Sequence, residues 1–209
     1  QHLAATEVHR AQLIDDAAAV GAWVRAAFES AKMPRGRVTM AVSRGDVVLK
    51  RFAVPSGELQ NEAELGNLVR LQMARQLTMT VEGTAIDYAA DVSPVVKEGN
   101  TEPASMMVTA GAMPADRVAW CRNVASAAGL KLESIGLRCV GASELLAEMS
   151  QRRSGTLLGV GMGFGSSEFV IVSDGRMVFA RAADAVRPGS RDDLDAFADK
   201  IAVEAKRTW

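Results

Sequence analysis

Apolar residues recur along this chain at two different spacings, and each spacing predicts a different kind of element. Spacings of three and four residues are typical of amphipathic helices, and short β-branched or apolar runs between turn residues are typical of strands. The predicted helices cover residues 15–32, 61–77, 114–129, 141–151 and 194–207. The predicted strands cover residues 37–43, 47–54, 85–90, 104–110, 132–138, 157–160, 169–172 and 177–180. Because both kinds occur throughout the chain, we expect helices packed on sheets.

The first two predicted strands, 37–43 and 47–54, are separated only by the turn Ser43-Arg44-Gly45-Asp46. We therefore expect them to pair as a hairpin. With the helix at 61–77 and the next two strands, the order becomes strand–strand–helix–strand–strand. This order is typical of a compact α+β subdomain.

A turn rich in glycine and serine lies between the predicted strands at 157–160 and 169–172. Glycine has no Cβ, so backbone N–H groups in such a turn can approach an anion closely. The turn is therefore a candidate phosphate-binding site. The alternative is a tight hairpin whose glycines serve steric needs only. The candidate phosphate-binding residues are Gly161, Gly163, Gly165, Ser166 and Ser167.

The composition excludes several classes of function. The 209 residues carry a formal net charge of −1 and only 5% aromatic residues, so neither a basic nucleic-acid surface nor a base-stacking surface is expected. No apolar run reaches the ~18 residues of a membrane span. The two cysteines, Cys121 and Cys139, and the two histidines, His2 and His9, fit no metal-ligand spacing. We expect no metal site of this kind, no catalytic nucleophile–base pair, and reduced thiols in a cytosolic protein.

Three segments, in their order along the chain, carry a resemblance to a known family. The first joins the strand at 38–43 to a strand ending in Val54-Pro55, an acidic helix and the strand Ile86-Asp87-Tyr88. The second runs from Met107 through Gly129-Leu130 to the next strand and helix, and the third is the glycine-rich turn. Together they resemble the PilM-like proteins of type IV pilus assembly. These proteins belong to the actin-like ATPase superfamily, with the cell-division protein FtsA and the cytoplasmic domain of GspL as relatives.

The resemblance implies an α/β fold: a fragment of an actin-like (ribonuclease H-like) ATPase domain with a small inserted α+β subdomain. Residues 1–36 would form the N-terminal helical part of the actin-like domain. Residues 37–112 would form the inserted subdomain. Residues 113–209 would form an actin-like subdomain with the phosphate-type hairpin and the start of a last helix. We therefore expect the chain to be a piece of a longer protein.

The same resemblance implies ATP and Mg²⁺ as ligands, but one position departs from the family. The family's hairpin begins with Asp-x-Gly, and the Asp helps to hold Mg²⁺; the matching residue here is Gly161. Glycine supplies no carboxylate, which indicates a degenerate ATPase with weakened or lost nucleotide binding. Glu168 is the nearest acid, out of register with that Asp, and whether its side chain is solvated stays open.

Lys206 and Arg207 resemble the helix that holds the nucleotide sugar in chaperone ATPases of the superfamily. The alternative is a basic helix end, which the helix dipole favours on its own.

The family's partner groove lies by the inserted subdomain. The resemblance therefore implies a cytoplasmic scaffold that binds the cytoplasmic tail of a PilN-like inner-membrane protein and reaches the membrane only through that partner. An active ATPase that drives conformational change, and a generic α/β domain with an accidental resemblance, are the alternative functions; a homo-oligomer is also open. The candidate partner-binding residues are Val38, Met40, Val42, Leu65, Val69, Ile86 and Tyr88.

Overall fold

The chain forms two compact units in the computed structural model, one made of Gln1–Asp46 with Ala119–Trp209 and the other of Val47–Val118. The second unit is thus a continuous segment inserted into the first. The structure describes residues 16–55, 61–77, 83–91, 105–151, 155–163, 166–185 and 193–209.

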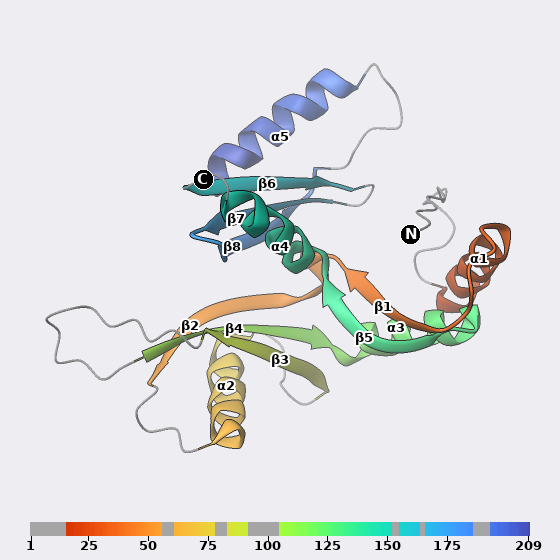
Figure 1. Ribbon diagram of the computed structural model, residues 1–209, viewed down its shortest axis with the longest axis horizontal. Helices are drawn as coiled ribbons and strands as arrows, with labels where there is room; N and C mark the ends of the chain where they lie inside the picture. Colours follow the sequence, from red (N-terminus) through yellow and green to blue (C-terminus); the bar gives the residue numbers. More distant parts are fainter. Residues whose placement is uncertain are drawn as a thin grey trace, which may run out of the picture. The chain divides into compact units, whose positions relative to one another are not determined.

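The inserted unit is an antiparallel sheet with a helix on one face (Figure 1). Its central strand, β4 (Ser105–Pro114), pairs with β2 (Val48–Pro55) on one side and with β3 (Thr84–Asp91) on the other. The helix, α2 (Glu62–Gln76), is capped by Asn61, whose Oδ1 accepts a hydrogen bond from the Glu64 N–H. Alternate residues of the strands face α2 and form the core of this unit. The fully buried members are Val54, Val69, Met73, Val108, Ala110 and Ala112.

The first unit contains two separate sheets. In one, β1 (Arg37–Val42) pairs in parallel with β5 (Lys131–Leu137). In the other, β7 (Ser167–Ser173) lies between β6 (Thr156–Met162) and β8 (Arg176–Ala183), and both pairings are antiparallel. The short 3₁₀ turn η2 (Arg44–Asp46) follows β1. The helices of the described part of this unit are α1 (Ala17–Ser30), α3 (Ala115–Ala128), α4 (Arg138–Gln151) and α5 (Leu194–Thr208).

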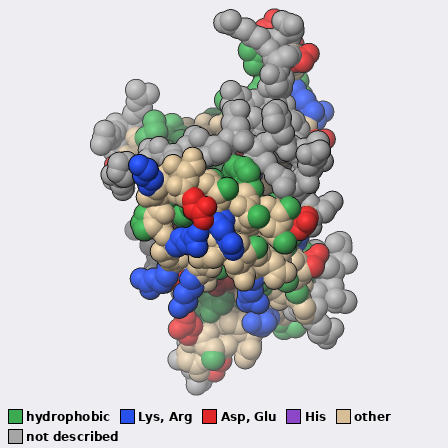
Figure 2. Space-filling view, turned by 90° about the vertical axis from the view of Figure 1, so that its right-hand side faces the viewer, with side chains coloured by type: hydrophobic (Ala, Val, Ile, Leu, Met, Phe, Trp, Pro, Cys, Tyr) green, Lys and Arg blue, Asp and Glu red, His purple; other side chains and the backbone are tan. Residues whose placement is uncertain are grey.

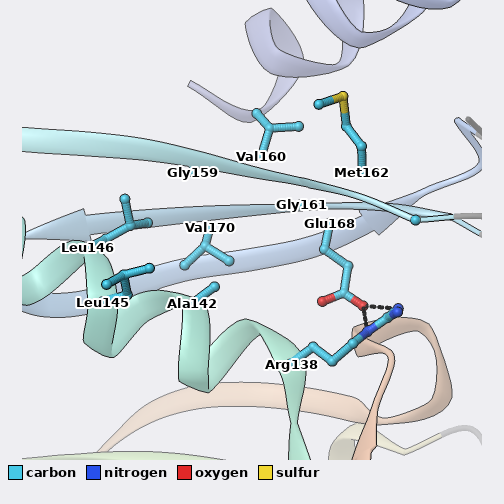
Figure 3. A pocket seen from close by; sticks show the side chains of 11 residues that line it. Arg138, Ala142, Leu145, Leu146, Gly159, Val160, Gly161, Met162, Glu168 and Val170 are labelled. Carbon is cyan, nitrogen blue, oxygen red and sulfur yellow. Dashed lines mark hydrogen bonds and ion pairs between the residues drawn. The ribbon is translucent and has the colours of Figure 1, made fainter. Parts of the chain in front are cut away.

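The position of β7 in the fold explains why its sequence is mostly apolar. α4 and α5 both contact it, and they lie on opposite faces of the β6–β7–β8 sheet (Figures 1 and 3). Every residue from Ser167 to Val172 is therefore buried, whichever face its side chain points to. A strand covered on both faces is typically apolar on both, as Phe169–Val172 is; the buried Ser167 and Glu168 are the polar exceptions.

The predicted hairpin of residues 37–43 with 47–54 is wrong. β1 pairs with β5, about which the local sequence carries no information, and β2 pairs with β4. The glycine of the intervening segment lies in a 3₁₀ turn instead of a hairpin turn. The inserted unit runs from Val47 to Val118, whereas 37–112 was predicted; its later start follows from the pairing of β1 with β5 of the first unit.

The other predicted elements appear close to their expected places. α4 begins three residues earlier than predicted, at Arg138, and β4 extends to Pro114. Of the predicted N-terminal part, 1–36, residues 1–15 lie outside the described residues.

Candidate functional site

The glycine-rich turn joins β6 to β7, as predicted, and Gly165 lies outside the described residues. Across the turn, the Gly163 N–H donates to the Ser166 carbonyl oxygen at 3.2 Å. A Cβ at Gly163 would lie 2.9 Å from that oxygen, which real side chains do not tolerate. Gly163 is therefore required for steric reasons. At Gly161, by contrast, a Cβ would meet only the Glu168 carbonyl oxygen, at 3.9 Å, so a side chain there has space.

The two serines of the turn already have partners within the chain. The Ser167 side chain is fully buried, and its hydroxyl donates to the Ala185 carbonyl oxygen at 2.6 Å. The Ser166 hydroxyl lies 3.4 Å from the hydroxyl of Ser43, the residue that follows β1. Ser167 thus ties β7 to the segment after β8, and Ser166 ties the turn to β1.

An ion pair beside the turn is the feature that sequence reasoning missed. The Glu168 side chain is 7% exposed, and its Oε1 accepts from Arg138 Nη2 at 2.6 Å and from Arg138 Nε at 3.2 Å. The same oxygen accepts from the Arg44 backbone N–H at 3.0 Å. Figure 3 shows Glu168 pointing from its strand to the guanidinium of Arg138, at the start of α4. Glu168 is therefore buried, not solvated, and it joins η2, α4 and β7.

The surroundings of this ion pair are partly dry. Burial lowers the pKa of the Arg44 guanidinium from its ordinary value, and the nearby Cys139 and Glu168 oppose that shift. Burial also raises the pKa of the Cys139 thiol, with Glu168 adding to the rise. Arg44 Nε donates to the Ala180 carbonyl oxygen at 3.2 Å, which fixes the η2 turn on β8. Electrostatic interactions are stronger here than at an open surface.

A pocket of about 440 Å³ lies between α4 and the β6–β7 side of the sheet. Gly159 and Gly161 lie on the side of β6 that faces α4. At Gly159, Leu146 fills the place of a side chain, since a Cβ would come 2.4 Å from Leu146 Cδ1; at Gly161 the space is open. In Figure 3, Ala142 and Leu146 point from α4 toward the sheet. Leu145 also lines the pocket but is largely exposed to solvent. The pocket is thus aliphatic along its length and charged at the end where Arg138 and Glu168 meet.

The predicted sugar-binding residues, Lys206 and Arg207, lie in the last turn of α5, and both are exposed. Arg207 Nη1 pairs with Glu204 Oε1 at 2.8 Å. Glu204 also pairs with Arg181 of β8, which donates to Thr208 Oγ1 from its Nε at 2.7 Å. Arg207 thus has an ion-pair partner within α5, while Glu204 and Thr208 link the helix to Arg181 of β8.

The predicted partner-binding residues fall into both units. Val38, Met40 and Val42 are half-buried on β1 of the first unit. The others belong to the inserted unit and pack around its core between α2 and the sheet; Val69 is fully buried there. Val69 is therefore a core residue whose side chain a partner cannot reach in this structure. The remaining members of this group are Leu65, Ile86 and Tyr88.

The described residues offer neither a metal-binding cluster nor a membrane-spanning helix. These residues contain no group of three or more His, Cys, Asp or Glu side chains that could hold a metal ion. None of their helices is both long enough and apolar enough to cross a membrane. On the face in Figure 2, Lys and Arg side chains are interspersed with acidic and hydrophobic ones.

Comparisons with known proteins find the fold but no close sequence relative. No protein-family model and no curated protein matches this chain. Among solved structures, the chain matches one in the "PilM-PilN type IV pilus biogenesis complex" with a TM-score of 0.74 and 20% identity. The match covers 95% of this chain and 58% of that one. A Bacteroides thetaiotaomicron protein of unknown function, described as having an actin-like ATPase fold, matches with a TM-score of 0.41 and 11% identity, over 89% of this chain and 62% of that one.

The match covers both units of this chain, including the inserted one, because only a few residues fall outside it. The predicted α/β fold class is thereby confirmed. This chain is PilM-like in its fold.

Proposed function

We propose that this chain is a scaffold of a type IV pilus or secretion assembly, which binds the cytoplasmic tail of a PilN-like inner-membrane protein. One observation carries the proposal: the fold match to the PilM–PilN complex, with a TM-score of 0.74 over 95% of the chain. The protein would work on the cytoplasmic side and reach the inner membrane through its partner. Its nucleotide binding would be weakened, since Gly161 offers no carboxylate to a metal ion.

We propose the edge of β3 as the place where an extended tail docks. β3 has β4 on one side only within the described sheet, and a strand edge offers backbone groups to an added strand. Its side chains alternate: Ile86 and Tyr88 face α2, while Asp87 and Ala89 are exposed. Small exposed side chains leave room for the side chains of a partner.

The test compares two exposed alanines on the same face of this sheet. Ala89 lies on β3 opposite Thr109, and Ala53 lies on the other edge strand opposite Met107. We expect Ala89→Arg to weaken binding of a fluorescent peptide of the PilN-like tail at least tenfold, and Ala53→Arg to leave it unchanged. Fluorescence anisotropy with the full chain measures both. Equal binding by the two variants would reject this docking edge. No binding by the unmodified chain would reject the function itself.

A further inference from the structure

The strand β6 lies at an edge of its sheet and lacks the charges that the other edge strands carry. Within the described sheets, the edge strands are β1, β2, β3, β5, β6 and β8. Each of them except β6 contains at least one charged residue, whereas β6 has the uncharged sequence Thr-Leu-Leu-Gly-Val-Gly-Met. Charged side chains on an edge strand discourage pairing with a further strand. The edge of β6 is therefore not protected against such pairing.

The register of the hairpin shows which backbone groups of β6 point away from β7. The Gly163 N–H donates to the Ser166 carbonyl oxygen, so these two residues form a hydrogen-bonded pair. Bonded and non-bonded pairs alternate along antiparallel strands. Counting back from Gly163 in the register with β7, every second residue of β6 bonds to β7, and the residues between them do not. The backbone N–H and C=O groups of Leu158, Val160 and Met162 therefore point toward the open edge.

Large apolar side chains are exposed on both faces of the sheet beside this edge. On the α4 face, Leu145 lines the pocket next to β6 and is 63% exposed. Met149, one turn further along the same side of α4, is 54% exposed. On the opposite face, Figure 3 shows Val160 and Met162 pointing away from α4, and Met162 is 58% exposed. Burial of these side chains against an added strand would be favourable.

The strand β6 is complementary to a second copy of itself. Antiparallel pairing about a two-fold axis at Val160 would place Leu158 opposite Met162, so that apolar residues meet. The outward N–H and C=O groups of the two strands would match, because the axis lies at an outward-facing residue. No charged residue of β6 would enter the interface. The edge strand β8, by contrast, carries Arg176 and Arg181.

We propose that this chain forms a two-fold dimer in which the β6 strands of two copies pair. The three-stranded sheet of each copy would then continue into that of the other. Such an interface is isologous and closes at two copies, because each copy uses its single β6 edge. The dimer goes beyond the proposed binding of a tail and does not depend on it, since the edge proposed for the tail belongs to the inserted unit.

Sedimentation equilibrium of the full chain over micromolar concentrations tests the dimer. We expect an equilibrium between monomer and dimer without larger species. Met162→Lys should raise the dissociation constant at least tenfold, because a lysine on an edge strand opposes pairing. The exposure of Met162 lets this variant keep its fold. Leu71→Lys is the matched control, since Leu71 of α2 is 54% exposed in the other unit, and this variant should dimerise as before.

Val160→Pro is a second, independent variant. It removes an outward N–H but no hydrogen bond to β7, so we expect a folded monomer by circular dichroism and sedimentation. In the unmodified chain, the amides of Leu158, Val160 and Met162 should exchange hydrogen more slowly in concentrated than in dilute solution. A monomer at every concentration, an open-ended polymer, or a dimer that Met162→Lys leaves unchanged would overturn the proposal.

Discussion

At the scale of one residue, the environment of Glu168 is decided by contacts with residues far away in the sequence. Its partners are Arg138, 30 residues earlier, and the backbone of Arg44, 124 residues earlier. Local spacing places Glu168 on a strand that leaves a turn, which fits a solvated acid as well as a buried one. The glycine pattern predicted the turn, but the ion pair depends on tertiary contacts that no local pattern encodes.

We predict that Glu168→Gln lowers the free energy of unfolding by about 1–3 kcal/mol, because a neutral amide replaces a buried carboxylate that holds a guanidinium. Urea denaturation of the full chain measures this loss. Glu133→Gln is the control. Both side chains of the Glu133–Arg37 ion pair are exposed, so the pair should contribute less than about 1 kcal/mol. Equal losses in the two variants would show that the buried pair has no special role.

At the scale of elements, helices and strands were predictable from periodicity, while strand pairing was not. The run at 37–42 reads as a strand from its own residues, yet its partner β5 lies more than 90 residues away in the chain. The nearer candidate, β2, pairs with β4 instead. A short glycine-containing link favours a hairpin on local grounds, and the tertiary fold overrides this preference.

We predict that Gly21→Leu lowers the free energy of unfolding by about 1–3 kcal/mol through overpacking. A Cβ at Gly21 of α1 would lie 2.4 Å from Ala127 Cβ and 2.6 Å from the Val124 carbonyl oxygen of α3, so the two helices are in close contact there. Gly36→Ala is the control, since nothing lies within 4 Å of its Cβ position. Chemical denaturation of both variants tests this contact, and a Gly21→Leu variant as stable as the unmodified chain would exclude it.

The attachment of α5 to the sheet should weaken as the pH falls into the acidic range. The hydrogen bond from Arg181 lowers the pKa of Glu204, with Arg207 adding to the effect. Glu204 therefore binds a proton less readily in the folded chain than in the unfolded one. Its contribution to stability is complete above the unfolded value of about 4.3 and is lost as the pH falls through the lower folded value.

We predict that hydrogen exchange of the α5 amides accelerates as the pH falls below about 4.3, once the intrinsic pH effect on exchange is removed. Arg181→Gln should flatten this additional pH dependence, because the pKa of Glu204 then returns toward its ordinary range. Arg122→Gln on α3 should keep the dependence of the unmodified chain. Identical profiles for Arg181→Gln and the unmodified chain would refute the role of this ion pair.

At the scale of the whole molecule, the order of short motifs predicted more than any single motif did. The PilM-like fold was expected from three weak segments, and the structural match covers 95% of the chain. The inserted unit begins later than predicted because β1 pairs with β5 of the first unit instead of with β2. The candidate partner residues were chosen for their apolar character, which also selects core residues; Val69 is one of these.

Binding of a PilN-like tail is the central claim, and hydrogen–deuterium exchange of the full chain with and without the tail peptide tests it most directly. We predict that the peptide slows exchange in β3 (Thr84–Asp91), because an added strand would accept hydrogen bonds from its outward-facing N–H groups. Slower exchange confined to the β6–β7–β8 sheet, or no change anywhere at saturating peptide, would contradict it.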